Sequence, residues 1–207
     1  METIVRIYEF RDFPNPRRVR VFLAEKGVSV PFEQVNVPEG EHRSPNFLAK
    51  NPYAAVPTLE LEDGTCISET VAICRYFEER HPAPALMGAT AREKAEIDMW
   101  QRRIESTIMN PVEAYFHHAT PGLGSLETYQ NEAWGRKNRE TALAAISRLD
   151  AQLGDKPFIA GETISIADVT GLCALDFAAL LDIEVPEDCG NVKRWHAALS
   201  SRPSAAA

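Results

Sequence analysis

Two short segments of this 207-residue chain have residue types that can hold a small peptide-like ligand. AVPTL at residues 55–59 places Pro57 at the start of an apolar strand, where proline cannot donate to a sheet ladder and can take a cis bond. A cis bond would let the backbone of Val56 pair with an extended peptide. SETVAI at residues 68–73 predicts a helix start, whose free N–H groups attract a carboxylate. Its Glu69 suits an ammonium group.

A ligand with a free α-amino-acid end and a peptide bond satisfies both segments, and glutathione is such a molecule. The whole set of motifs resembles the cytosolic glutathione transferase family over nearly the whole chain. The motifs are FPNPRRVR at 13–20, NP at 51–52, VPTL at 56–59, SETVAI at 68–73 with YF at 76–77, FIAG at 158–161 and SIAD at 165–168. Because they keep the family's order and spacing, the resemblance predicts its fold and its use of glutathione as co-substrate.

The resemblance assigns the γ-glutamyl end of glutathione to the predicted helix start. Glu69 takes the ammonium, and the hydroxyl and N–H of Thr70 take the carboxylate. Val56, next to Pro57, contributes backbone groups only. The alternative for Glu69 is that its charge merely stabilises the helix dipole.

Cations near this site are fewer than the resemblance leads us to expect. The glycyl carboxylate of glutathione needs one, and His42 and Lys50 are the candidates. Residues 54–55, just before the proline motif, are both alanine, where relatives often have a longer polar side chain. Arg17 and Arg18 are expected in solvent or at a dimer interface, from which one of them can raise the local positive potential.

The thiol activator is where this chain departs from its relatives. Glutathione attacks as a thiolate, so its site must lower the thiol pKa with hydrogen-bond donors and a helix N-terminus. Relatives often have Ser or Thr where this chain has Phe13, which borders glutathione but cannot donate. Asn15 is the candidate catalytic residue because its amide can donate to sulfur; alternatively it is only the helix N-cap. Tyr8 lies one residue out of phase with a tyrosine-type activator, which puts it on the other strand face.

The electrophile pocket is assigned to aromatic residues, namely Phe10 and the cluster of Tyr115, Phe116 and His117. The alternative for the cluster is core packing, which is common for an apolar stripe on a helix. We expect no metal site, because His117 and His118 have no further ligands at metal-binding spacing.

Composition excludes several classes of protein. The net charge of −8 and the pI near 5.2 argue against a nucleic-acid or anionic-membrane surface. The N-terminal residues lack the features of a signal peptide, and no apolar run approaches the length of a membrane span. We therefore expect a soluble, cytoplasmic protein.

The four cysteines form no Cys-x-x-Cys pair and have no His at metal-ligand spacing. We expect Cys66, Cys74 and Cys173 to be buried hydrophobes. Cys189 falls in an apparent loop and is expected to be exposed, but it lacks a basic neighbour that would make it a nucleophile.

The order of patterns predicts a small mixed sheet covered by helices, followed by a helical region. The resemblance identifies these as an α/β thioredoxin-like, glutathione-binding N-terminal domain at residues 1–80 and an all-α C-terminal domain at 89–207. Expected strands are 4–8, 32–37, 56–61 and 65–67, and expected helices are 16–26, 45–50 and 69–80. Residues 81–88 are a Pro-rich linker. Capping boxes at Thr90 and Ser165 predict two helix starts, and Pro111 predicts a kink or an end.

The predicted function is therefore that of a glutathione transferase, which conjugates the glutathione thiolate to a small hydrophobic electrophile in detoxification. The resemblance also predicts a homodimer. Two alternatives stay open, namely glutathione-dependent disulfide reduction and a non-catalytic binding protein that keeps the fold. Phe13 is compatible with the first of these, whereas the Glu69–Thr70 pair and Pro57 argue against the second.

Overall fold

A computed structural model describes residues 5–123 and 126–207. Its chain divides into two compact units, which we call unit 1 (residues up to 84, with 207) and unit 2 (residues 85–206). The point of division falls inside the predicted 81–88 linker. The predicted domain limits of 80 and 89 stay predictions.

Unit 1 is built on a 4-stranded sheet in the order β2-β1-β3-β4. The strands are β1 (Arg6–Glu9), β2 (Phe32–Gln34), β3 (Thr58–Glu60) and β4 (Cys66–Ser68). β1 and β2 are parallel, whereas β1–β3 and β3–β4 are antiparallel. The helices are α1 (Pro14–Lys26), the 3-10 turn η1 (Glu41–Arg43), α2 (Pro45–Leu48) and α3 (Thr70–Arg80). This is the predicted small mixed sheet with helices.

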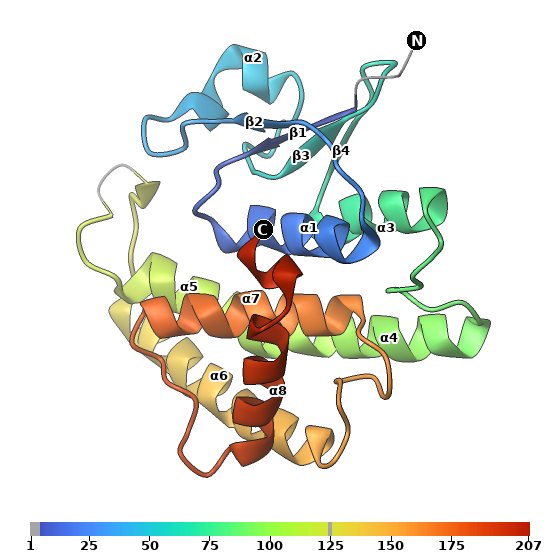
Figure 1. Cartoon of the computed structure of the whole chain (residues 1–207). Helices are drawn as coiled ribbons and strands as arrows, with labels where there is room; N and C mark the ends of the chain where they lie inside the picture. Colours follow the sequence, from blue (N-terminus) through green and yellow to red (C-terminus); the bar gives the residue numbers. More distant parts are fainter. Residues whose placement is uncertain (1–4, 124–125) are drawn as a thin grey trace. The chain divides into compact units, whose positions relative to one another are not determined.

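The alternation of β1 distributes its side chains between two different layers. Tyr8 points to the α2 layer, where its ring meets Phe47 edge-on at 6.2 Å. Ile7 and Glu9 point to the opposite face, and Glu9 pairs there with Arg20 of α1. In Figure 1, α1 and α3 cover one face of the sheet and α2 covers the other. A single step along β1 therefore decides which helix layer a side chain reaches.

Unit 2 consists of helices (Figure 1). They are α4 (Ala91–Ile104), the π-helical turn η2 (Glu105–Met109), α5 (Asn110–Ala119), α6 (Glu132–Leu153), α7 (Ile166–Leu180), α8 (Gly190–Ser200) and the 3-10 turn η4 (Pro203–Ala206). α4, η2 and α5 follow one another without a loop, and Pro111 lies in the first turn of α5. The expected disturbance near Pro111 is thus a π-helical turn just before it, which frees the backbone from the regular bonding that proline prevents.

Both predicted capping boxes are confirmed. Thr90 caps α4 with Glu93, and Ser165 caps α7 with Asp168. The Asp168 carboxylate is fully buried and accepts hydrogen bonds from the Ile159 N–H at 2.8 Å and from the Trp195 indole at 2.9 Å. Burial raises the pKa of Asp168, and these donors oppose that rise. The second box therefore joins α7 to α8 and to the loop before α7.

Two expectations about local structure were wrong. α1 begins at Pro14 with Phe13 as its N-cap, so Asn15 is inside the first turn and is not a cap. Pro14 explains the earlier start, because its fixed φ suits a helix and it has no N–H to leave unsatisfied. The predicted strands 32–37 and 56–61 shorten to three residues each, since only part of each pairs in the ladder, whereas β1 ends and β4 begins and ends one residue later than predicted.

The cysteines differ from expectation at two positions. Cys74 and Cys173 are buried as predicted. Cys66 is only half-buried, because β4 is an edge strand. Cys189 is buried rather than exposed, with its sulfur 3.9 Å from the Ser147 hydroxyl. Burial raises the pKa of the Cys189 thiol, which makes it a poor nucleophile.

Neither a membrane-spanning helix nor a metal-binding cluster is found among the described residues. No helix there has the length and apolarity needed to cross a bilayer. No group of three or more His, Cys, Asp or Glu side chains in these ranges is placed to hold a metal ion.

Candidate functional site

The two ligand-binding segments predicted from the sequence meet at one end of the β3–β4 hairpin. The Val56–Pro57 peptide bond is cis, as predicted. Thr58 pairs with Ser68 across the hairpin, so Pro57 and Glu69 leave its open end as neighbours. The backbone of Val56 and the first turn of α3 therefore belong to one surface of unit 1.

Glu69 is the exposed N-cap residue of α3 and has an unusual backbone. Its φ of 69° lies in the left-handed region, which costs free energy for a residue with a Cβ and is concentrated at ligand sites. No described residue donates a hydrogen bond to its carboxylate. The carboxylate thus stands in solvent beside the free N–H groups of a helix N-terminus.

Thr70 is buried, and its hydroxyl is held by an arginine from a different helix. The guanidinium of Arg18 on α1 donates to Thr70 Oγ1, and it donates to Asn15 Oδ1 at 2.8 Å. The Arg18 residue is 6% exposed, so its expected place in solvent or at a dimer interface was wrong. The physical reason is that α1 and α3 pack side by side. The spacing of Asn15 and Arg18, three residues apart on one helix face, was a signal that sequence reasoning missed.

The loop before α1 is fixed by a polar network, centred on a buried ion pair, that the sequence did not reveal. Glu9 and Arg20 form a buried ion pair, and Gln34 Nε2 donates to Glu9 Oε1 at 2.7 Å. Arg20 also donates to the carbonyl of Arg11 at 2.7 Å, and the Arg11 N–H donates to Gln34 Oε1 at 3.0 Å. Strand, helix and loop are thus bonded together at the N-terminus of α1.

Phe10 and Phe13 lie in this loop, with ring centroids 4.8 Å apart. The Phe13 N–H donates to the Phe10 carbonyl at 3.1 Å, which closes the turn that leads into α1. Both residues are half-buried. They form an apolar edge immediately before the helix N-terminus.

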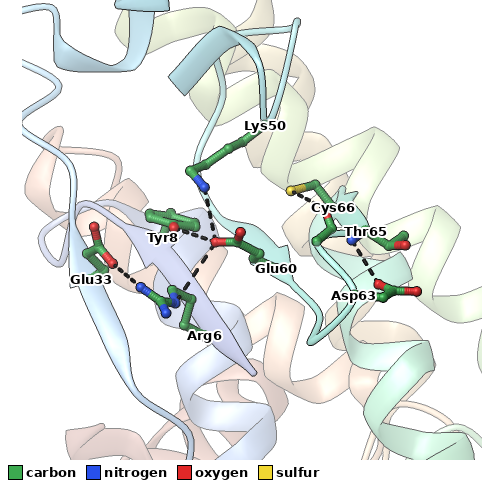
Figure 2. A network of polar contacts seen from close by, with 9 residues as sticks. Arg6, Tyr8, Glu33, Lys50, Glu60, Asp63, Thr65 and Cys66 are labelled. Atoms are coloured by element: carbon green, nitrogen blue, oxygen red, sulfur yellow. Dashed lines mark hydrogen bonds and ion pairs between the residues drawn. The ribbon is translucent and has the colours of Figure 1, made fainter. Parts of the chain in front are cut away.

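Tyr8 and Lys50 belong to a different polar network, on the α2 face of the sheet (Figure 2). Both converge on Glu60, with the Tyr8 hydroxyl 2.5 Å and the Lys50 ammonium 3.1 Å from Oε2. The Lys50 ammonium also lies 4.8 Å from the centre of the Tyr8 ring. Arg6 approaches the same carboxylate at 3.9 Å and bonds Glu33 at 3.3 Å. The hydroxyl of Tyr8 is therefore already engaged as a donor.

The pKa shifts in this network follow from its hydrogen bonds and burial. Burial, and then the bond to Glu60, raise the pKa of Tyr8. The Tyr8 hydroxyl is the main cause that lowers the pKa of Glu60, and its bond is the main cause that raises the pKa of Lys50. All three shifts favour a protonated tyrosine between a carboxylate and an ammonium. This arrangement holds the sheet to the segment after α2.

His42, the other glycyl candidate, is in η1 and is 7% exposed. Its Nδ1 has no hydrogen-bond partner among the described residues. Burial, followed by the charge of Arg43, lowers the pKa of His42, so the ring is neutral at pH 7. Lys50 is bonded to Glu60, whereas one buried ring nitrogen of His42 has no hydrogen bond to any described residue.

The remaining predicted pocket residues lie on α5 of unit 2. Tyr115 and Phe116 are half-buried and His117 is exposed. Phe116 packs against Phe177 of α7 with centroids 5.5 Å apart, which agrees with a part in core packing. His117 Nδ1 lies 2.5 Å from a carboxylate oxygen of Glu127.

Two pockets outlined by described residues lie elsewhere. One of about 900 Å³ in unit 1 is at the C-terminal ends of α1 and α3, lined by residues such as Lys26, Tyr76 and Arg80. The other, of about 520 Å³, lies between α4, η2 and α6 in unit 2. Neither includes a predicted site residue. The chemistry of the hairpin end and the helix N-termini identifies the site better than pocket size does.

The chain is similar in sequence and in structure to known glutathione S-transferases. A family model described as "Glutathione S-transferase, N-terminal domain" matches residues 7–85, and "Glutathione S-transferase, C-terminal domain" matches residues 105–203. Glutathione S-transferase 2 of Saccharomyces cerevisiae is 44% identical over 96% of this chain and 86% of its own length. The crystal structure of Gtt2 from that yeast has a TM-score of 0.92 and 44% identity, covering 96% of this chain and 97% of that one. A glutathione S-transferase domain-containing protein from Marinobacter aquaeolei has a TM-score of 0.94 and 45% identity, covering 96% and 98%.

Proposed function

Because this chain belongs to the glutathione S-transferase family and is a glutathione transferase, we propose that its glutathione site lies on unit 1, over the N-termini of α1 and α3. The observation that carries this proposal is that the backbone of Val56 and the exposed Glu69, with its left-handed backbone, flank the same end of the hairpin. One segment offers backbone groups to a peptide, and the other offers a carboxylate and helix N–H groups to an amino-acid end.

The γ-glutamyl end of glutathione is bound by Glu69 and Thr70. The Glu69 carboxylate accepts hydrogen bonds from the ligand ammonium, and the Thr70 hydroxyl and N–H donate to the ligand carboxylate. The left-handed backbone of Glu69 supports this assignment, because strained backbone at an exposed helix start is expected where a ligand is bound.

The rest of the peptide lies along Val56 and ends near a nitrogen donor for the glycyl carboxylate. Between the two predicted candidates, His42 is favoured over Lys50. The Lys50 ammonium is engaged with Glu60 at 3.1 Å. In His42 the Nδ1 atom is enclosed by protein, so Nε2, which has no hydrogen-bond partner among the described residues, is the nitrogen proposed to meet the ligand. A neutral imidazole can still donate one N–H to a carboxylate.

The reaction starts from the thiol of bound glutathione, which loses its proton to water. Asn15 and the N–H groups at the start of α1 stabilise the thiolate. The sulfur then attacks an electrophilic carbon, a carbon–sulfur bond forms, and a leaving group such as chloride departs with the electron pair of its bond. Phe13 borders glutathione, Phe10 beside it offers an apolar surface to the electrophile, and Tyr115, Phe116 and His117 are further candidates for the electrophile pocket.

The cellular setting is part of the same proposal. We expect a cytoplasmic homodimer that detoxifies small hydrophobic electrophiles, without nucleic-acid or membrane partners. Family membership supports the dimer. Light scattering of the purified protein tests it, and cell fractionation tests the location.

Calorimetry with glutathione tests the site. Glu69→Ala should weaken binding at least about tenfold, about 1.4 kcal/mol, because it leaves the ligand ammonium without its charged partner. Glu62→Ala is the matched control, since Glu62 is an exposed carboxylate in the hairpin turn. Equal affinities of the two variants would remove Glu69 from the site.

Turnover assays separate conjugation from the alternative of disulfide reduction. A chloronitrobenzene substrate reports carbon–sulfur bond formation, whereas a mixed disulfide reports transfer of glutathione between sulfurs. Conjugation should be measurable with the first substrate. Turnover of the disulfide alone would contradict the proposed reaction while leaving the glutathione site intact.

A further inference from the structure

The guanidinium of Arg18 joins the two ends of the proposed glutathione site. Arg18 is a residue of α1 and is only 6% exposed. Its guanidinium donates hydrogen bonds to Asn15 Oδ1, at 2.8 Å, and to Thr70 Oγ1. Asn15 is the proposed donor to the sulfur, and Thr70 is the proposed donor to the γ-glutamyl carboxylate. A single buried side chain thus contacts both.

The chemistry of arginine fixes the direction of these two contacts. A guanidinium has five N–H donors and no acceptor, and it stays protonated in proteins. Thr70 Oγ1 and Asn15 Oδ1 must therefore both accept. The single proton of the Thr70 hydroxyl then points away from Arg18, and so does the –NH₂ end of the Asn15 amide. Both side chains are turned into oriented donors.

The charge of Arg18 adds to this orientation. Asn15 Oδ1 and Thr70 Oγ1, the two atoms that Arg18 contacts, belong to neutral groups. Since Asn15 and Thr70 lie in the first turns of α1 and α3, the guanidinium is close to two helix N-termini, whose dipole ends are also positive. Positive charge near a helix N-terminus favours the binding of an anion there. Glutathione carries two suitable anions, a thiolate and a carboxylate.

We propose that Arg18 is a positioning residue, which aims Asn15 at the sulfur and Thr70 at the γ-glutamyl carboxylate of glutathione. This inference rests on the proposed function. It predicts that one substitution changes both the thiol pKa of bound glutathione and the affinity for its γ-glutamyl end. A residue that merely held α1 against α3 would change the melting temperature only.

The test compares Arg18→Gln and Arg18→Lys with Arg17→Gln, a control that removes the same charge from the neighbouring, half-buried residue. The thiol pKa of bound glutathione is read from the pH dependence of kcat/KM and from the ultraviolet absorbance of the thiolate. We expect Arg18→Gln to raise that pKa by about one unit and to weaken glutathione binding about ten- to hundredfold, as for the loss of charged hydrogen bonds. Arg17→Gln should leave both within about twofold.

S-Methylglutathione isolates the second contact, because it keeps the γ-glutamyl carboxylate and has no thiol. Its affinity should fall at least about tenfold in Arg18→Gln. Arg18→Lys keeps the charge but, with one ammonium, cannot reproduce both directed bonds. We expect it to recover most of the thiol pKa and to leave the affinity reduced several-fold. If Arg18→Gln does not fold, the thiol pKa and the two ligand affinities of Arg18→Lys test the inference.

Several outcomes would overturn the inference. A folded Arg18→Gln with a lower melting temperature but an unchanged thiol pKa and affinity would show a structural clamp only. An Arg18→Lys protein indistinguishable from wild type in affinity for both ligands would exclude directed bonding. If wild-type protein binds no glutathione, it is the proposed function that fails, so the two failures are distinguishable.

Discussion

The buried pair of Glu9 and Arg20 gives the sharpest test of how the site is supported. Arg20→Met removes one charge from a pair in which Glu9 is 1% and Arg20 is 7% exposed. It also removes the bond from Arg20 to the Arg11 carbonyl. The methionine fills most of the arginine volume, so the main perturbation is a buried carboxylate that has lost its counter-charge and keeps the hydrogen bond from Gln34.

The expected cost follows from this burial. Breaking a buried ion pair by removing one partner destabilises a protein by about 3–5 kcal/mol. For a chain of this size, each kcal/mol lowers Tm by about 2–4 °C, so Arg20→Met should lower Tm by about 6–20 °C. Because the pair fixes the loop before α1, we also expect kcat/KM for conjugation to fall by about 10²-fold.

Calorimetric melting and steady-state kinetics provide the assay, with Arg6→Met as the matched control. Arg6 of β1 also pairs with a glutamate, Glu33 of β2, but its side chain is 40% exposed and that of Glu33 is 54% exposed, so water screens the interaction. The double variant Glu9→Gln/Arg20→Met removes both charges and should recover a large part of the lost stability. If Arg20→Met melted no lower than Arg6→Met, the reasoning from burial would be refuted.

Two further predictions concern the thiol activator and pH. Asn15→Ala should lower kcat/KM for a chloronitrobenzene by up to about 10²-fold, as for a lost transition-state donor. Tyr8→Phe should keep its turnover but lose stability, because the Tyr8 hydroxyl bonds Glu60. If Tyr8→Phe lost turnover and Asn15→Ala kept it, Tyr8 would be the activator. His42 has a lowered pKa in the folded protein, so the unfolded chain binds the proton more readily, and stability should fall as pH drops below about 6.5 and stop falling once the folded pKa is passed. Denaturant melts of wild type and His42→Asn across this range check the sign, and identical pH slopes would contradict it.

Local features of unit 1 could be predicted because they depend on residues a few positions apart. The cis Val56–Pro57 bond, the hairpin around Gly64 and the helix start after Glu69 were all confirmed in place. The error at Asn15 was also local, since the first of two prolines around it, Pro14, already starts the helix. Proline and glycine restrict the backbone whatever surrounds them, which makes such signals readable in sequence.

The partners of charged and polar side chains could not be predicted in this way. Arg18 was expected in solvent or at a dimer interface, and Lys50 was considered for a ligand carboxylate, because each has a partner that only the packing of separate elements brings close. Arg18 meets Thr70, and Tyr8 meets Glu60, in each case 52 residues away. Glu9 and Arg20 look like ordinary surface charges until strand and helix pack together.

The sequence by itself thus determined the family, the sheet-and-helix order of unit 1 and the segments that offer backbone and carboxylate groups to glutathione. Only the tertiary structure decided which side chains are buried against one another, and hence that Tyr8 is engaged with Glu60 while Arg18 joins Asn15 to Thr70. The physical reason is that backbone preferences act over one or two turns. The energy of a buried charge depends instead on whichever donors and acceptors the fold brings within hydrogen-bond distance.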